Sequence, residues 1–174
     1  YDFKAILSYH IISQIGYMIM GLGLYTVLGL AGAVYYIAHH IIVKSGLFLL
    51  SGATSRITGQ TDFKHYSGLL ASYPGLAYTF FATAISLAGV PPFSGFFAKF
   101  ALLKAAVEKG AWGIAAVSLV VSFFTLFSMI KIFRKAYWGR PSGQSIQRDR
   151  KDYIAALSPA VILLALSVAM GLGG

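Results

Sequence analysis

The chain has 174 residues, of which 57% are hydrophobic and 11% are charged, and its mean hydropathy is +0.74. A soluble domain carries about 25% charged residues, so this composition indicates an integral membrane protein. Its net charge of +9 does not indicate a nucleic-acid partner, because most basic residues lie in short loops between apolar stretches. The absence of cysteine excludes disulfides and thiolate metal sites.

Five apolar stretches are long enough to cross a bilayer, taking about 20 residues for each crossing. The third stretch is too long for one span and contains Pro91 and Pro92, which stop or kink a helix. We therefore expect two half-helices, 75–89 and 96–108, joined by an extended link that includes Pro91, Pro92 and Gly95. Such a break is tolerated only where it is buried in protein or lines a wet cavity. The sequence predicts a single all-α, polytopic transmembrane bundle with spans at 3–24, 30–54, 74–108 (broken at 90–95), 111–133 and 153–172.

The connecting loops divide the basic residues unevenly between the two sides of the predicted bundle. If the spans alternate in direction, one side carries nine Lys and Arg residues, whereas the other carries Lys104 and Lys109. The positive-inside rule places the basic side, with loops 55–73 and 134–152, in the cytoplasm. The nine residues are Lys4, Arg56, Lys64, Arg134, Lys135, Arg140, Arg148, Arg150 and Lys151.

Four of the stretches carry their polar residues at helical spacing, which places them on one face. This pattern predicts a bundle with a polar interior and a lipid-facing exterior. For the Ser and Thr stripes alone, the alternative is ordinary packing, with bonds to the preceding turn or a neighbouring helix. His10 is a candidate proton-translocation residue, but it can equally be a structural hydrogen-bonding residue. The four sets are His10, Ser13, Gln14 and Tyr17; Tyr36, His40 and Lys44; Thr79, Thr83 and Ser86; and Ser118, Ser122 and Thr125.

Two lysines are the strongest candidates for function. Lys44 lies about 10 residues from either end of its stretch, beyond the reach of a snorkelling side chain, and Lys99 follows the double proline. A charged side chain in hydrocarbon costs at least ~2.5–3.5 kcal/mol. Because burial disfavours the charged form, such lysines can take up and release protons, and His39 and His40 can relay them. Adjacent histidines point ~100° apart on a helix and no carboxylate lies within the spans, so we expect no metal site and no cofactor.

Three segments resemble the antiporter-like membrane subunits, a family that includes the proton-pumping subunits of complex I, related hydrogenase subunits and Mrp-type sodium/proton antiporter subunits. Residues 2–17 (DFKAILSYHIISQIGY) resemble the family pattern Asp-x-Lys-x-x-x-x-Tyr-x-x-x-Ser-x-x-Gly. Residues 38–50 (AHHIIVKSGLFLL) resemble its His-x-x-x-Lys-x-x-x-Phe-Leu helix, and residues 89–99 (GVPPFSGFFAK) resemble its discontinuous helix. The sequence HHIIVK at residues 39–44 and the lysine in the discontinuous helix, Lys99, most resemble those of the D subunits of Mrp antiporters.

The resemblance implies helices ten to fourteen of a fourteen-helix fold with two inverted five-helix repeats, so the N-terminal part of the full protein is expected to be missing. It also implies that His40, Lys44 and Lys99 lie on a central polar axis. The expected partners are other membrane subunits of a hetero-oligomeric antiporter, the lipid bilayer, protons and sodium, in a prokaryotic cell membrane.

Three functions remain open from the sequence. The first is a proton-translocating, non-enzymatic subunit of a multi-subunit sodium/proton antiporter. The second is a proton-pumping subunit of a complex I-like oxidoreductase or membrane hydrogenase, which would use the same axis. The third is a structural scaffold, which the cost of the two buried lysines argues against.

Overall fold

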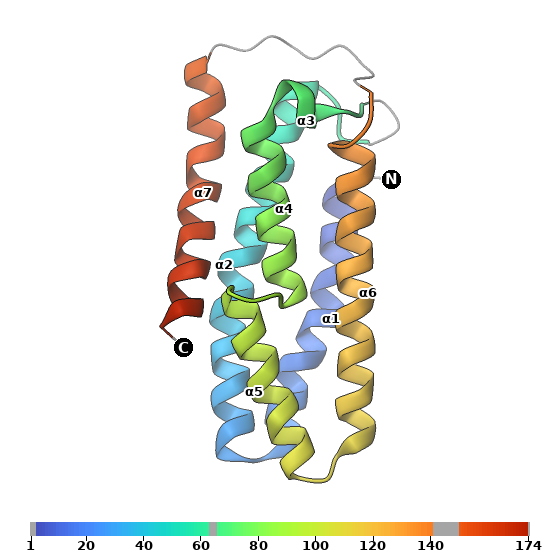
Figure 1. Ribbon diagram of the computed structural model, residues 1–174, viewed down its shortest axis with the longest axis vertical. Helices are drawn as coiled ribbons and strands as arrows, with labels where there is room; N and C mark the ends of the chain where they lie inside the picture. The colour runs from blue at the N-terminus through green and yellow to red at the C-terminus, as the bar shows by residue number, and fades with distance from the viewer. Residues whose placement is uncertain (1–2, 63–65, 141–149, 174) are drawn as a thin grey trace.

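All regular elements in the described residues, 3–62, 66–140 and 150–173, are α-helices in this computed structural model (Figure 1). The predicted all-α fold class is therefore confirmed. The charged loops are described only in part, since 63–65 and 141–149 lie outside these ranges. The helices are α1 (Phe3–Leu24), α2 (Val27–Thr58), α3 (Leu69–Ser72), α4 (Pro74–Ala88), α5 (Ser94–Glu108), α6 (Trp112–Ala136) and α7 (Arg150–Leu172).

Four of these helices are long and apolar enough to cross a membrane: α1, α2, α6, and α7 from Tyr153 onward. At 1.5 Å per residue, α4 and α5 are each only about 22 Å long, whereas the hydrocarbon core is about 30 Å thick. Figure 1 shows that they lie end to end and together match the length of α2 and α6. Compared with the expected stretch 30–54, α2 begins three residues earlier and ends four residues later, at Thr58.

The two half-helices are separated by residues 89–93. Helix α4 ends at Gly89, whose left-handed conformation (φ 92°) turns the N–H of Val90 back to the carbonyl of Ile85. Helix α5 begins at Ser94, and the N–H of Phe96 already donates to the carbonyl of Phe93. The link was expected to extend to residue 95; Gly95 instead belongs to the first turn of α5. That glycine is needed for close packing rather than for the break, as described below.

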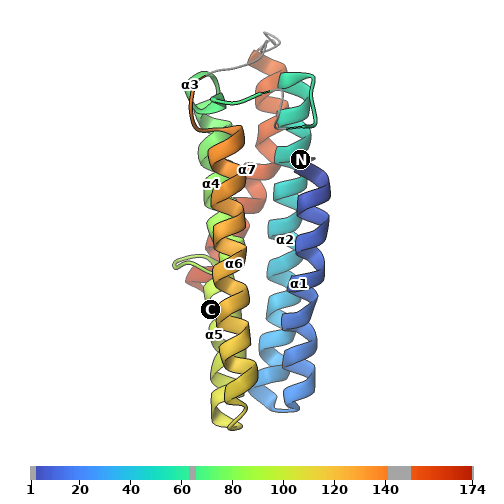
Figure 2. The same cartoon turned by 90° about the vertical axis from the view of Figure 1, so that its right-hand side faces the viewer.

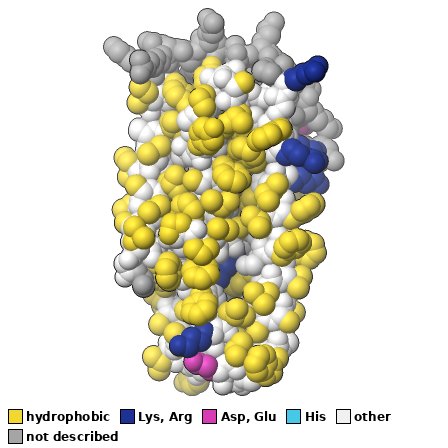
Figure 3. Space-filling model, viewed as in Figure 1, with side chains coloured by type: hydrophobic (Ala, Val, Ile, Leu, Met, Phe, Trp, Pro, Cys, Tyr) yellow, Lys and Arg dark blue, Asp and Glu magenta, His cyan; other side chains and the backbone are white. Residues whose placement is uncertain are grey.

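Helix α2 is the central element of the bundle, because α1, α4, α5 and α7 all pack against it. Figure 2 shows α1 and α2 side by side, with α4, α5 and α6 on the other side of the bundle. At one end of the bundle, the Lys109 ammonium donates to the carbonyl of Leu24 and so ties the α5–α6 turn to the end of α1. The face shown in Figure 3 is dominated by hydrophobic side chains, and most of its visible basic groups lie toward the two ends.

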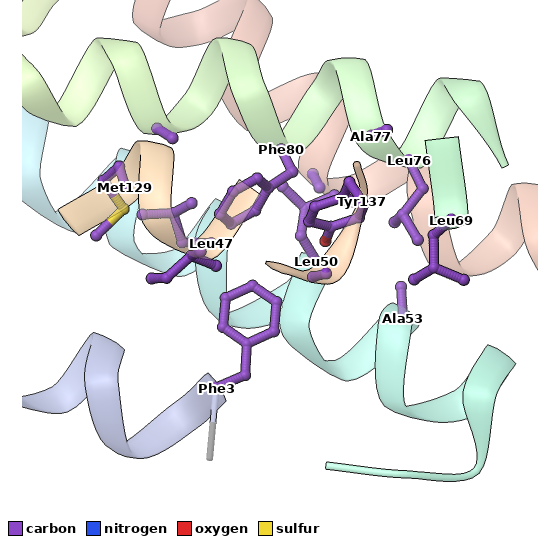
Figure 4. Close-up of a cluster of buried hydrophobic side chains, with 14 of the residues drawn as sticks. Phe3, Leu47, Leu50, Ala53, Leu69, Leu76, Ala77, Phe80, Met129 and Tyr137 are labelled. Carbon is purple, nitrogen blue, oxygen red and sulfur yellow. The ribbon is translucent and has the colours of Figure 1, made fainter. Parts of the chain in front are cut away.

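The buried apolar side chains form two clusters at different heights. In the cluster nearer the α3 end, Phe80 packs between Tyr137 (ring centroids 4.9 Å apart) and Phe3 (5.4 Å), as Figure 4 shows. The other cluster contains Tyr17, Tyr36 and other side chains from α1, α2, α5 and α6. Along α1 and α2, the turns between these clusters carry His10, Gln14, His39 and His40, and Lys44 lies next to Val43 at the edge of the first cluster. The fold therefore holds a polar layer between two apolar ones.

Candidate functional site

Lys99 lies against the end of the first half-helix. Its ammonium donates to the carbonyls of Leu87 (3.1 Å) and Ala88 (3.0 Å), and only 9% of the residue is exposed. Both acceptors belong to the last turn of α4, where the break removes the following N–H groups that would otherwise bond to them. The C-terminal end of a helix carries partial negative charge and attracts cations. The helix break thus supplies the ligands for a buried ammonium group.

Aromatic and hydroxyl groups complete the surroundings of Lys99. The ammonium lies 4.9 Å from the ring centroid of Tyr17, an arrangement that stabilises a cation over the ring face. The Tyr17 hydroxyl lies 2.5 Å from the carbonyl of Ser118 and 3.1 Å from the Ser122 hydroxyl, both on α6. A cavity of about 280 Å³ borders Lys99 and is lined in part by Tyr17, Gly89, Ser118 and Ser122. The site therefore has space for small polar species beside the ammonium.

A buried hydrogen-bonded network joins α1, α2 and α6 in the middle of the polar layer. The Tyr36 hydroxyl donates to Gln14 Oε1, and Gln14 Nε2 donates to Thr125 Oγ1 (3.2 Å) and to Ser13 Oγ (3.1 Å). The ring of Tyr36 stacks on that of Tyr17, with centroids 5.3 Å apart. Gln14 and Tyr36 are both fully buried. This network leads from the surroundings of Lys99 toward the histidines of α2.

Lys44 is the second buried cation, and it is held differently from Lys99. Its ammonium donates to the carbonyl of Leu7 in the neighbouring helix α1, at 2.7 Å, and 5% of the residue is exposed. Its charge acts electrostatically on His10 and His40. His10 Nε2 lies 2.8 Å from the Ser128 hydroxyl of α6. In the described part of the chain, His40 Nε2 is buried without a hydrogen-bond partner. Lys44 and these two histidines therefore form one group, between α1 and α2.

His39 faces a different set of side chains from its neighbour His40. Its Nδ1 lies 2.7 Å from the Ser94 hydroxyl, at the start of α5. That hydroxyl is 2.9 Å from the hydroxyl of Ser167 in α7, which in turn is 2.7 Å from the hydroxyl of Ser86 in α4. The sequence indicated Ser86 but missed Ser94 and Ser167. Ser94 could have been found from its position two residues after the double proline, whereas Ser167 is isolated in an apolar helix and gave no signal.

Some predicted lining residues bond within their own helices. Thr79 donates to the carbonyl of Gly75 and Thr83 to that of Thr79, both at 2.7 Å. Such bonds to the preceding turn satisfy the hydroxyl without building a site, which was the alternative given for these stripes. Thr125 also donates within its own helix, to Val121, but accepts from Gln14 as well. In the described ranges, no group of three or more His, Asp or Glu side chains could hold a metal ion.

The chain is similar to a known family of membrane proteins and to curated antiporter subunits. Residues 1–125 match the family "NADH:quinone oxidoreductase/Mrp antiporter, TM". The chain is 58% identical to the D subunit of the Na+/H+ antiporter of Alkalihalophilus pseudofirmus, over 98% of this chain and 34% of the relative. It is 36% identical to the protein of the same name from Bacillus subtilis, over 97% of this chain and 34% of the relative. The chain thus spans about a third of the length of these curated relatives.

Solved structures show the same arrangement of helices. A chain of the Mrp complex from Dietzia sp. DQ12-45-1b superposes with a TM-score of 0.89 at 35% identity, covering 99% of this chain and 40% of the other. A chain of respiratory complex I from Thermus thermophilus gives a TM-score of 0.77 at 26% identity, covering 98% of this chain and 39% of the other.

Proposed function

Because the chain belongs to the NADH:quinone oxidoreductase/Mrp antiporter transmembrane family, we propose that it is the proton-translocating part of a sodium/proton antiporter subunit. The relatives named as D subunits of Na+/H+ antiporters and the neighbour from an Mrp complex support this assignment. The observation that carries it is the pair of buried ammonium groups, Lys44 at the edge of the first apolar cluster and Lys99 at the edge of the second, with buried polar residues between them. A protein without a charge-transfer role has no reason to bear the cost of burying two lysines.

The proposed proton path connects the two lysines through the polar layer. Near Lys44, the charge of the ammonium acts on His10 and His40, so a proton moving between these groups changes the field at the others. The Tyr36 ring stacks against His40 with centroids 6.4 Å apart, and its hydroxyl joins the Gln14 network. Tyr17 then lies against both Tyr36 and Lys99. In this path lysines and histidines hold protons, and hydroxyl groups and water move them between these groups.

The membrane arrangement is part of the same proposal. The five predicted spans cross the bilayer, with α4 and α5 acting as one discontinuous span. The end of the bundle where α2 and α6 finish, which carries the loops 55–73 and 134–152, faces the cytoplasm of a prokaryotic cell. The hydrophobic outer faces of the helices contact lipid and other membrane subunits of a hetero-oligomeric antiporter.

The test is transport by the complete antiporter complex that contains this chain. In proteoliposomes with an acid interior, added sodium should dissipate the pH gradient, as reported by recovery of acridine orange fluorescence. Choline chloride at equal ionic strength is the control for salt effects. Sodium-independent fluorescence would contradict a sodium antiporter.

The second candidate is a proton-pumping subunit of a redox complex, which the likeness to complex I favours. The same purified complex separates the two candidates. Copurifying flavin, iron–sulfur clusters or quinone reductase activity would support the redox complex, and their absence together with sodium-driven antiport would support the antiporter.

A further inference from the structure

A chain of three serine hydroxyls connects both sides of the helix break to α7 and ends on His39. The four residues come from α4 (Ser86), α7 (Ser167), α5 (Ser94) and α2 (His39), and all four are fully buried. Consecutive polar atoms lie 2.7, 2.9 and 2.7 Å apart, which is the range of good hydrogen bonds. The chain therefore links the last turn of one half-helix to the first turn of the other through a third helix.

These hydroxyls behave differently from several other buried hydroxyls of the bundle. Thr79 and Thr83 each donate to a carbonyl one turn earlier in their own helix, and Thr54 does the same although it also lies 3.0 Å from the Tyr137 hydroxyl. In contrast, the serines of the chain bond to side chains of other helices. Ser94 does not act as a helix cap either, because the N-cap of α5 is Phe93, and that cap has no side-chain hydrogen bond. Helix capping and ordinary back-bonding therefore do not account for the serine chain.

The series of serine hydroxyls can be hydrogen-bonded in either of two directions, because each hydroxyl carries one proton. In one direction, Ser86 donates to Ser167, Ser167 to Ser94, and Ser94 to His39 Nδ1, so the neutral ring carries its proton on Nε2. In the other direction, Nδ1–H donates to Ser94, and Nε2 has a free lone pair. Only the second direction lets Nε2 accept a proton, because in an imidazolium both nitrogens are donors.

His39 Nε2 is positioned at the break, on the side of the ring that the serines leave free. In the described residues this atom is buried and has no hydrogen-bond partner. A Cβ at Gly95 would lie 2.9 Å from His39 Nε2, so the glycine allows the ring to approach the first turn of α5. On the α4 side, a Cβ at Gly89 would lie 2.9 Å from Lys99 Cδ and 3.3 Å from the carbonyl oxygen of Gly95. Because these two positions are glycines, the side chains of His39 and Lys99 can both pack against the backbone of the helix break.

We propose that Ser94, Ser167 and Ser86 are positioning residues for His39, and that the direction of their hydrogen-bond chain decides whether His39 Nε2 can accept a proton from Lys99. In the transfer, an N–H bond of the Lys99 ammonium breaks and a new N–H bond forms at Nε2, directly or through water. Lys99 becomes neutral and the ring becomes an imidazolium that donates from Nδ1 to Ser94. This inference rests on the proposed function.

Other charged and titratable groups near His39 belong to the proposed path. Lys99, from α5, and His40, from α2, are the titratable groups that lie near enough to interact electrostatically with His39. The Tyr36 ring lies 5.6 Å from the His39 ring. The serines themselves do not titrate, so they affect His39 through hydrogen-bond direction alone. Removing one hydroxyl should therefore change the tautomer of His39 while leaving these surrounding groups in place.

The experiment compares alanine variants along the chain in the complete antiporter complex. Ser94→Ala removes the hydrogen-bond partner of His39 itself. Ser167→Ala removes the hydroxyl that bonds to Ser94, and Ser86→Ala removes the last hydroxyl of the series, farthest from His39. Sodium-driven antiport per assembled complex should fall by about threefold to tenfold for the loss of one buried hydrogen bond, with Ser94→Ala most affected and Ser86→Ala least. Ser167→Thr, which keeps the hydroxyl, should restore transport. Ser158→Ala is the matched control, because Ser158 is exposed on the same helix α7.

A second readout is independent of transport. Solid-state 15N NMR of histidine-labelled complex, with the His39 signal assigned by its loss in His39→Gln, reports which ring nitrogen carries the proton. The Nδ1-to-Nε2 ratio should change in Ser94→Ala and Ser167→Ala and stay at its wild-type value in Ser158→Ala. An unchanged ratio in both variants would overturn the proposal, as would wild-type transport by Ser167→Ala. If Lys99→Ala is inactive while the serine variants are normal, the proposed function stands, and only the proposed role of the three serines is wrong.

Discussion

Lys44 and Lys99 are both buried ammonium groups bonded to main-chain carbonyls, but their acceptors have different origins. Lys44 donates to Leu7, in the second turn of the unbroken helix α1. Lys99 donates to Leu87 and Ala88, whose carbonyls are left open by the end of α4. An interior carbonyl already accepts a helical hydrogen bond and offers only its second lone pair, whereas the carbonyls of a helix end have no helical partner.

This difference indicates what a broken helix contributes to a cation site. It supplies two acceptors and the negative end of a helix dipole at mid-height in the bundle, without any carboxylate. The position of Lys99 therefore depends on the backbone of the break itself. Lys44 depends instead on the packing of α1 against α2. Changes at the break should consequently affect transport more than equivalent changes elsewhere.

The largest effect is expected for Lys99→Ala. Removing the ammonium leaves the carbonyls of Leu87 and Ala88 without their cation and removes the proposed proton-carrying group, so sodium-driven antiport should fall to background. The same complex should assemble to near wild-type amounts, as checked by size-exclusion chromatography. Lys104→Ala is the matched control on α5, because Lys104 is more than half exposed and only pairs with Glu108 at 3.8 Å. Antiport by Lys99→Ala at the wild-type rate would remove Lys99 from the mechanism.

Lys44→Ala should reduce transport strongly, by at least about tenfold, the loss expected when a positioned proton carrier is removed. The effect should be smaller than that of Lys99→Ala, because His10 and His40 remain beside the vacated position. Lys131→Ala provides the control, since Lys131 is exposed on α6. Initial rates of antiport in vesicles measure the difference. A Lys44→Ala complex as fast as Lys131→Ala would show that protons bypass this lysine.

A pair of glycine substitutions separates backbone strain from displacement of Lys99. Gly89 and Gly110 both have positive φ, 92° and 73°, so alanine costs about 1–2 kcal/mol at each position. Only at Gly89 would the new Cβ meet Lys99, at 2.9 Å from its Cδ; at Gly110 no atom lies within 4 Å. Gly89→Ala should therefore reduce antiport severalfold, whereas Gly110→Ala should only lower thermal stability. Equal loss of transport in both variants would mean that strain alone is responsible.

The features of this site that could be predicted from the sequence are those with local signals. The cost of a lysine in an apolar stretch identifies Lys44 and Lys99, and the double proline identifies the break. The bonding of each hydroxyl could not be predicted, because helical spacing gives a face but does not choose between a neighbouring helix and the preceding turn. Thr83 and Ser86 share one predicted stripe, yet Thr83 bonds within α4 and Ser86 bonds to Ser167.

Ser167 shows most clearly what could not be predicted from the sequence. Its two hydroxyl partners, Ser86 and Ser94, are 81 and 73 residues away in the chain, so their meeting depends on how α7 packs against both half-helices. Gly95 is a related case. Its position near the prolines suggested an extended link, but the structure shows it in α5, where a side chain would meet His39 and the carbonyl of Ser86. Close packing, which has no sequence signature of its own, explains this glycine.

The smallest expected effect is that of His40→Ala. His40 lies one helical turn before Lys44 and shares its electrostatic surroundings, but its Nε2 makes no hydrogen bond to any described residue. Its loss therefore removes one relay position while leaving the Leu7 contact of Lys44 intact. We expect antiport to fall by about twofold to fivefold, less than for the serine variants, because His40 Nε2 has no hydrogen bond to lose. His40→Gln, which keeps polar atoms that can bind water but cannot carry a proton, sharpens the result. If His40 relays protons, glutamine should be as slow as alanine; recovery with glutamine would show that His40 only holds water beside Lys44.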